Sequence, residues 1–116
     1  EILQLQKEIR KVQVTSDVED YIIRLIQATR THPALQLGAS PRAMLALYHA
    51  SQAIAAMRGR EYVIPDDVKY LTPFVLTHRI IPRMESHLHG QTAEQALSEV
   101  LASIPVPVEG DIGVEK

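Results

Sequence analysis

Residues 37–59, LGASPRAMLALYHASQAIAAMRG, contain one helix whose start and end are both marked in the sequence. Ser40 can serve as the N-cap, because its hydroxyl can accept a hydrogen bond from a free backbone N–H of the first turn. Pro41 suits the first helical position, which needs no N–H. Gly59 suits the position just past the end, where a left-handed residue closes a helix. Since the residues between are apolar almost all round, we expect the helix over 40–58 to be the central and most buried one.

Arg42 is the unusual residue of this helix, because a cation in the first turn opposes the helix dipole at a cost of roughly 0.3–1 kcal/mol. Free N–H groups at a helix start suit an anion, and a guanidinium can bind phosphate oxygens through two hydrogen bonds. Most exposed arginines need no ligand, so Arg42 taken alone favours an ordinary surface side chain.

Three segments in and after this helix together resemble the C-terminal lid domain of MoxR-type AAA+ ATPases. They are GASPRA at 38–43, RGREYV at 58–63 and PDDV at 65–68. Each motif is weak alone and specific in combination, and the resemblance runs from about Val12 to about Arg79. In that family the G-x-S-P-R segment carries the sensor 2 arginine, which contacts bound nucleotide. Arg42 occupies the matching position.

The resemblance implies a function exercised within a larger ATPase. The lid would close over ATP and Mg²⁺ held by a separate AAA+ core, and Arg42 would act on the γ-phosphate, with Ser40 and Pro41 shaping the helix start. The family also implies homo-hexamers, chaperone-like assembly or maturation of other proteins, and von Willebrand A-domain partners in a bacterial cytoplasm. Whether Arg42 acts within its own subunit or on a neighbour stays open.

Length and composition fit one small domain with an aliphatic core. The chain has 116 residues, of which 46% are hydrophobic and only 4% aromatic. A net charge of −2 argues against a nucleic-acid-binding domain. The absence of cysteine excludes a disulfide framework and a thiol nucleophile, and it fits a cytosolic protein. No apolar run approaches the ~20 residues of a membrane span, and no signal peptide is visible.

Periodicity predicts a mainly α fold, a small helical bundle of the AAA+ lid type with at most two very short strands. Besides the central helix, we expect helices over residues 1–11, 16–31 and 65–76, and a last helix after residue 92. Two capping boxes mark helix starts, Ser16 with Glu19 and Thr92 with Gln95. Pro73 predicts a kink or a division into two short helices.

The segments between the helices are expected to be short strands and loops. Residues 12–14 and 61–64 are the candidate strands, and a ladder between them would be marginal alone. Residues 32–39 and 85–90 are expected to be loops, the first with Gly38 at a backbone angle that other residues resist.

The helical domain is expected over residues 1–104, followed by a disordered tail over 105–116 that is rich in Pro, Gly and charge. The chain starts at Glu1 without a Met and already in a helical pattern. We therefore expect it to be a fragment of a larger protein.

Other charged residues near the central helix have ordinary structural explanations. Asp66 and Asp67 are adjacent and would not face each other on a helix, which favours helix-start charges over an acid–base pair. Arg58 and Arg60 could pair across an interface, but solvated side chains are the favoured interpretation. Ile64 stands where the family usually has Thr, so a missing cap hydroxyl predicts a frayed helix start.

The sequence predicts neither a metal site nor a catalytic set. His87 and His89 would point to different faces of a helix, with Glu85 as the only plausible third ligand, whereas zinc needs three or four convergent ligands. A G-x-x-x-x-G-K-[ST] loop and a convincing Ser/His/Asp grouping are both absent from the sequence, so we expect no activity from the fragment alone. A stand-alone helical interaction module without a nucleotide role is the alternative function.

Overall fold

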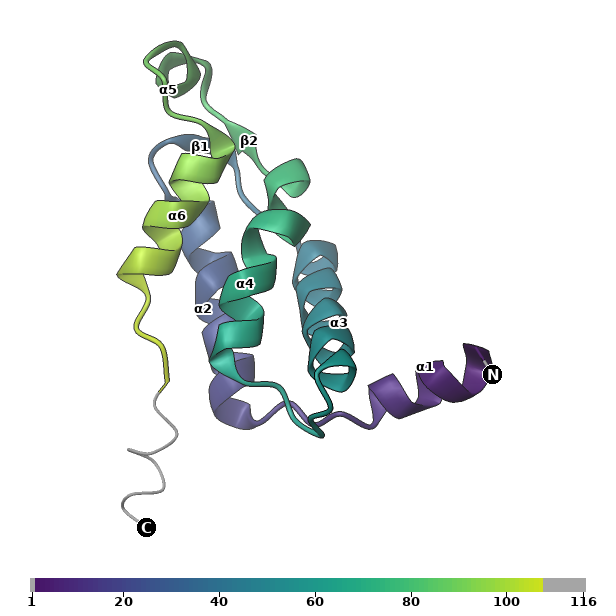
Figure 1. The fold of residues 1–116 in the computed structure, drawn as a ribbon. Helices are drawn as coiled ribbons and strands as arrows, with labels where there is room; N and C mark the ends of the chain where they lie inside the picture. Colours follow the sequence, from purple (N-terminus) through teal and green to yellow (C-terminus); the bar gives the residue numbers. More distant parts are fainter. Residues whose placement is uncertain (1, 108–116) are drawn as a thin grey trace.

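Residues 2–107 are described by the structure, a computed structural model, and they form a helical bundle with one small sheet at its end (Figure 1). The helices are α1 (Ile2–Arg10), α2 (Ser16–Thr31), α3 (Pro41–Met57), α4 (Pro65–Leu76), α5 (Met84–Leu88) and α6 (Ala93–Ser103). A 3₁₀ turn over Thr77–Arg79 follows α4, and β1 (Leu35–Leu37) pairs antiparallel with β2 (Ile81–Pro82). The predicted mainly α bundle with at most two very short strands is confirmed.

Four helices enclose the core. α2 contacts α3, α4 and α6, and α4 contacts α3 and α6. α1 contacts α3 and projects away from the body, while α5 caps the opposite end beyond the two strands (Figure 1). None of the helices within residues 2–107 has both the length and the hydrophobicity needed to cross a bilayer.

α2 supplies more of the large buried side chains than α3 does. Its buried residues are Val18, Tyr21, Ile22, Leu25, Ile26 and Thr29. Those of α3 are Ala43, Leu47, Ser51, Gln52 and Ala55. On α3, Leu45 remains 54% exposed and Met57 83% exposed. The prediction that the helix over 40–58 is the most buried is wrong, because its apolar circumference is wider than the surface that its neighbours cover.

Both predicted ends of the central helix are confirmed. Ser40 Oγ accepts a hydrogen bond from the Ala43 N–H at 3.2 Å. Gly59 has φ of +77°, the left-handed conformation expected of a closing glycine. The Arg60 N–H donates to the Ala55 carbonyl at 2.9 Å, which is the long bond of a Schellman motif.

The capping box at the last helix is also present, whereas the one at α2 is not. Thr92 Oγ1 accepts from the Gln95 N–H at 3.1 Å, and the Gln95 side chain accepts from the Thr92 N–H at 3.0 Å. At α2 the cap is Thr15, whose Oγ1 accepts from the Val18 N–H at 3.4 Å. The capping box predicted with Ser16 as the N-cap is therefore wrong, because Thr15 is the N-cap and Ser16 is already the first residue of the helix.

The sheet lies outside the segments predicted as strands. Residues 12–14 and 61–64 form only a single parallel bridge, in which the Gln13 N–H donates to the Glu61 carbonyl at 2.9 Å. The pairing goes no further, because the next residues cap α2 on one side and lead into Pro65, which has no N–H, on the other.

Three further segments differ from or extend the expectations. β1 and α5 occupy the two predicted loops, and α4 runs through Pro73 as one helix, so its division into two is wrong. Of the predicted disordered tail, residues 105–107 are described, and Val106 packs partly buried against the core. Residues 108–116 lie outside the described part of the chain.

Asp67 ties the end of α3 to the start of α4. Its side chain is fully buried, at 0% exposure, and its carboxylate lies 2.5 Å from Arg60 Nη2 and 3.4 Å from Arg58 Nη1. The same carboxylate accepts from the Ile64 N–H at 3.0 Å. The interpretation as solvated is therefore wrong for Arg60, whereas Arg58 pairs with Asp67 and keeps 46% of its side chain exposed. The Ile64 N–H at the start of α4 is bonded from within the helix, which is half of a capping box without a cap hydroxyl.

We expect Asp67→Asn to lower the free energy of unfolding by about 3 kcal/mol, because it removes the charge that two guanidinium groups share in a buried site. The matched control is Asp66→Asn, an exposed carboxylate in the same turn that should contribute less than about 1 kcal/mol. Urea unfolding of both variants measures the difference. Equal losses would show that Asp67 acts only as a helix-start charge.

Candidate functional site

The loop before α3 is fixed to the end of α2 through both backbone polar groups of Ala39. The Ala39 N–H donates to Thr29 Oγ1 at 2.9 Å, and the Ala39 carbonyl accepts from Arg30 Nε at 2.8 Å. The Thr29 hydroxyl in turn donates to the Ile26 carbonyl at 2.6 Å, so its one donor is also used. These bonds place Ser40 and the first turn of α3 at a defined point beside α2.

Gly38 lets this loop approach α2 closely. A Cβ atom built on Gly38 would lie 2.6 Å from both the Cα and the backbone N of Arg30. The positive φ angles within residues 2–107 belong to Gly59 and Gly90, so the expected unusual backbone angle at Gly38 is wrong. The position requires glycine because backbone meets backbone there.

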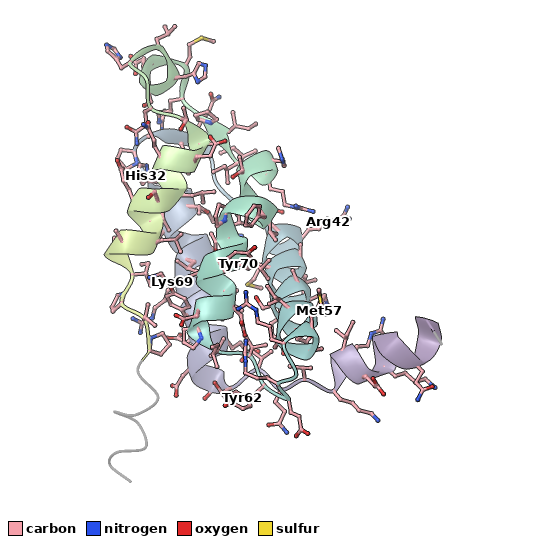
Figure 2. All side chains as sticks on the ribbon, in the orientation of Figure 1. His32, Arg42, Met57, Tyr62, Lys69 and Tyr70 are labelled. Carbon is pink, nitrogen blue, oxygen red and sulfur yellow. The ribbon has the colours of Figure 1, made fainter. Side chains whose placement is uncertain are left out.

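Arg42 lies in the first turn of α3, at the end of the helix that this loop fixes (Figure 2). The side chain is exposed, and the first turn contains no acidic residue. Among the described residues it makes neither a hydrogen bond nor an ion pair. The guanidinium is thus an exposed positive charge on a fixed helix start, with its donors available to a ligand.

The backbone contributes less to this site than the sequence suggested. Pro41 has no N–H, the Ala43 N–H bonds to Ser40 Oγ, and the Met44 N–H bonds to the Ser40 carbonyl at 3.1 Å. In the first turn of α3, the Arg42 N–H is the remaining backbone donor without a hydrogen bond among the described residues. The guanidinium is therefore the main anion-binding group of this helix start.

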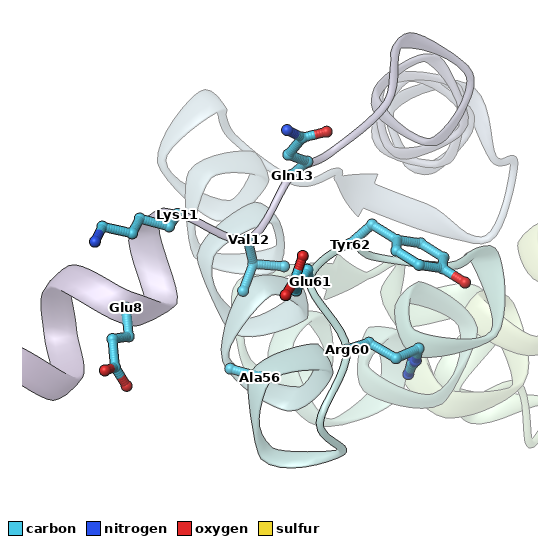
Figure 3. Close-up of a pocket in the computed structure, with 8 residues that line it drawn as sticks. All are labelled: Glu8, Lys11, Val12, Gln13, Ala56, Arg60, Glu61 and Tyr62. Atoms are coloured by element: carbon cyan, nitrogen blue, oxygen red, sulfur yellow. The ribbon is translucent and has the colours of Figure 1, made fainter.

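A depression of about 610 Å³ lies at the opposite end of α3, between α1 and the segment after α3 (Figure 3). Its lining includes Ala56, Arg60 and Tyr62, and it mixes Lys11 with Glu8. Ala56 lies 14 residues after Arg42 on the same helix, which is about 21 Å along the axis. The depression is thus separate from the predicted nucleotide-binding residue, and its mixed charges select no anion.

His32 makes hydrogen bonds that hold the structure together. His32 Nδ1 accepts from the Ala34 N–H at 3.0 Å, so the Nε2–H donates to Glu99 Oε1 at 2.8 Å. The Gln91 amide and His32 together lower the pKa of Glu99 through hydrogen bonds to its carboxylate. No group of three or more potential metal ligands occurs within residues 2–107.

Comparison with known proteins identifies the domain. The family described as "AAA lid domain" matches residues 27–100, which contain the Thr29–Ala39 contact, Arg42 and Asp67. The chain is an AAA lid domain.

Relatives support this assignment. The lid domain is 33% identical over 116 residues to Chaperone MoxR1 of Mycobacterium tuberculosis, covering 92% of this chain and 31% of that protein. It is 43% identical over 105 residues to the uncharacterized protein YeaC of Bacillus subtilis, covering 90% of this chain and 33% of the relative. The chain thus spans about a third of the length of these relatives.

A solved structure has the same fold. The crystal structure of a "putative ATPase" from Cytophaga hutchinsonii superposes with a TM-score of 0.87 at 31% identity, over 92% of this lid domain and 35% of that chain. The helical arrangement around Arg42 is therefore that of a domain found within larger proteins.

The sequence singles out Arg42, Ser40 and Pro41 as candidates, but it does not reveal the residues that hold this segment in place. Thr29 and Arg30 belong to an ordinary amphipathic helix, and their contacts with Ala39 span ten and nine residues. Gly38 was the one local sign of this contact in the sequence. We attributed it to an unusual backbone angle, whereas the structure shows a close approach to the α2 backbone.

We expect Gly38→Ala to lower the free energy of unfolding by about 1–3 kcal/mol, because the added methyl group overlaps the α2 backbone. It should also speed hydrogen exchange at the Ala39 amide. Gly59→Asn is the contrasting variant, since its Cβ meets nothing within 4 Å and Asn tolerates a left-handed backbone. Unchanged stability and Ala39 protection in Gly38→Ala would contradict the close-approach argument.

Proposed function

We propose that this lid domain closes over ATP bound by an AAA+ core and presents Arg42 to the γ-phosphate, as the sensor 2 position of the family implies. Ser40 and Pro41 shape the helix start that carries it. The observation that supports the proposal is an exposed, unpaired guanidinium on a helix start that is fixed to the neighbouring helix through Ala39.

Arg42 would act by electrostatics. A preorganised positive charge stabilises the charge that develops during phosphoryl transfer, and it needs little reorganisation when the mount is rigid. In proteins of this family the core binds ATP and Mg²⁺. The lid domain would contribute the Arg42 guanidinium and the helix start that carries it.

The contacts that hold α3 at both ends would also let the lid domain move as a rigid body. α3 is held at one end by the Ala39 contacts and at the other by Asp67, so a displacement of Arg42 carries the neighbouring helices with it. Rigid-body movement of this kind is a common way to couple hydrolysis to a change in a partner.

By family, we further propose a homo-hexamer in the bacterial cytoplasm that assists assembly or maturation of other proteins, with a von Willebrand A-domain protein as partner. The relative named Chaperone MoxR1 is compatible with this role.

A stand-alone interaction module is the second candidate, and exposed aromatic residues on α4 favour it. Tyr70 is 52% and Phe74 64% exposed, and the Arg58 guanidinium lies 5.3 Å from the centre of the Tyr70 ring. This surface requires no nucleotide, so the two functions are separated by testing Arg42.

We expect Arg42→Ala in the full-length protein to lower steady-state ATP turnover, by up to about 10³-fold if Arg42 acts as catalytic arginines do at phosphoryl transfer. Melting of the lid domain should be unchanged or slightly raised, because the variant removes a cation that opposes the helix dipole. Arg42→Lys should fall between, since it keeps the charge but loses two-point binding.

Arg24→Ala is the control, an exposed arginine of α2 that pairs with Asp20 at 2.8 Å. It should leave turnover unchanged. Normal turnover together with a lowered melting temperature in Arg42→Ala would make Arg42 a structural residue and leave the interaction module as the better function.

A further inference from the structure

β1, β2 and α5 lie together at one end of the molecule (Figure 1). Four large apolar side chains of these elements are exposed. They are Leu37 (56% exposed), Ile81 (51%), Met84 (71%) and Leu88 (75%). Leu37 and Ile81 are register partners across the two strands, and Met84 and Leu88 lie one helical turn apart on the same face of α5. We call these four residues the apolar tip.

The apolar tip does not serve the core of its own domain. α5 buries none of its residues, and it is anchored through its backbone, as in the bond from the Arg83 N–H to the Ala34 carbonyl at 2.8 Å. Large apolar side chains exposed together at one end of a domain are typical of an interaction site.

The charges beside the tip define what can cover it. Arg83 directly precedes Met84, and Arg79 lies just before β2; both are exposed. Glu85 is the acidic residue of α5. An occupant must therefore offer an apolar recess with negative charge at its rim.

This lid domain contains such a recess between α2 and α3. A groove of about 240 Å³ is lined mainly by apolar residues, among them Ile23, Met44, Leu45 and Tyr48, and its polar lining residues are Glu19 and His49. Ile23 and Leu45 are 37% and 54% exposed. Within the described chain Glu19 makes no ion pair.

The other exposed apolar surface, on α4, fits the tip less well. Tyr70 and Phe74 there are accompanied by Lys69 and by Arg58, which is shared with Asp67. Cations on both sides would repel, whereas Glu19 would attract Arg83.

We propose that the apolar tip of one copy of this domain docks into the α2–α3 groove of a second copy, with Arg83 facing Glu19. Because tip and groove are different surfaces, the contact is heterologous, and repetition closes a ring or extends a line. This inference goes beyond the nucleotide role and does not depend on it.

The contact should be weak between isolated domains. Four side chains cover much less than the roughly 800 Å² per partner of a stable interface, so other contacts in the whole protein would add to it. Covalent capture is suited to such a contact, and the natural chain has no cysteine to interfere.

We would place single cysteines at the tip (Leu88→Cys) and in the groove (Leu45→Cys), give the two chains different tags, and treat the mixture with a short bis-maleimide. Tip-to-groove dimers should exceed tip-to-tip and groove-to-groove dimers by about tenfold, a preference of ~1.4 kcal/mol. Ser98→Cys, exposed on α6, is the control for random encounter.

Charge variants test the orientation. Arg83→Glu on the tip chain, or Glu19→Arg on the groove chain, should each reduce the mixed dimer several-fold, and the two together should restore it. A mixed yield no greater than random pairing with Ser98→Cys would overturn the proposal, as would equal yields for all charge combinations. Neither assay involves ATP, so its result is independent of the Arg42 experiment.

Discussion

The buried carboxylate of Asp67 is the interaction on which the arrangement of α3 and α4 depends. It receives two guanidinium groups from the residues that flank Gly59 and one N–H from the start of its own helix. A buried charge of this kind tolerates few alternatives, because each lost partner leaves the buried carboxylate less fully compensated. The Schellman turn at Gly59 places Arg58 and Arg60 where the carboxylate needs them. Helix closure and ion pairing are thus one structural unit.

At the other end of α3, hydrogen bonding and close packing have the same effect. The Ala39 backbone is bound by Thr29 and Arg30, and Gly38 lets the loop lie against the α2 backbone. α3 is therefore held at both ends, at its start by residues of α2 and at its end by Asp67 of α4. Arg42 is thus attached to a fixed point of the backbone, while its exposed guanidinium has no partner within the described residues and would be ordered by the ligand that it binds.

The features predictable from the sequence were those governed by nearby residues. Ser40, Gly59 and the Thr92 box each depend on residues within a few positions, and all three have the expected geometry. The partners of Arg58 and Arg60 and the pairing of β1 with β2 depend on how helices come together, so the sequence pattern did not contain them. Arg42 is an intermediate case, since its local setting was ambiguous and the resemblance to a family gave it a role.

The error about α3 has a physical explanation that bears on function. The apolar pattern of a helix indicates which of its faces are buried in the complete assembly. It does not indicate whether the surface that buries them belongs to the same domain. In the isolated domain Leu45 and Met57 are exposed, as are the four residues of the tip. Relatives about three times as long as this chain contain further surface that can cover such residues. The excess of apolar residues over what this core needs is therefore best explained by contacts with other domains or other copies, which is where a lid domain must act.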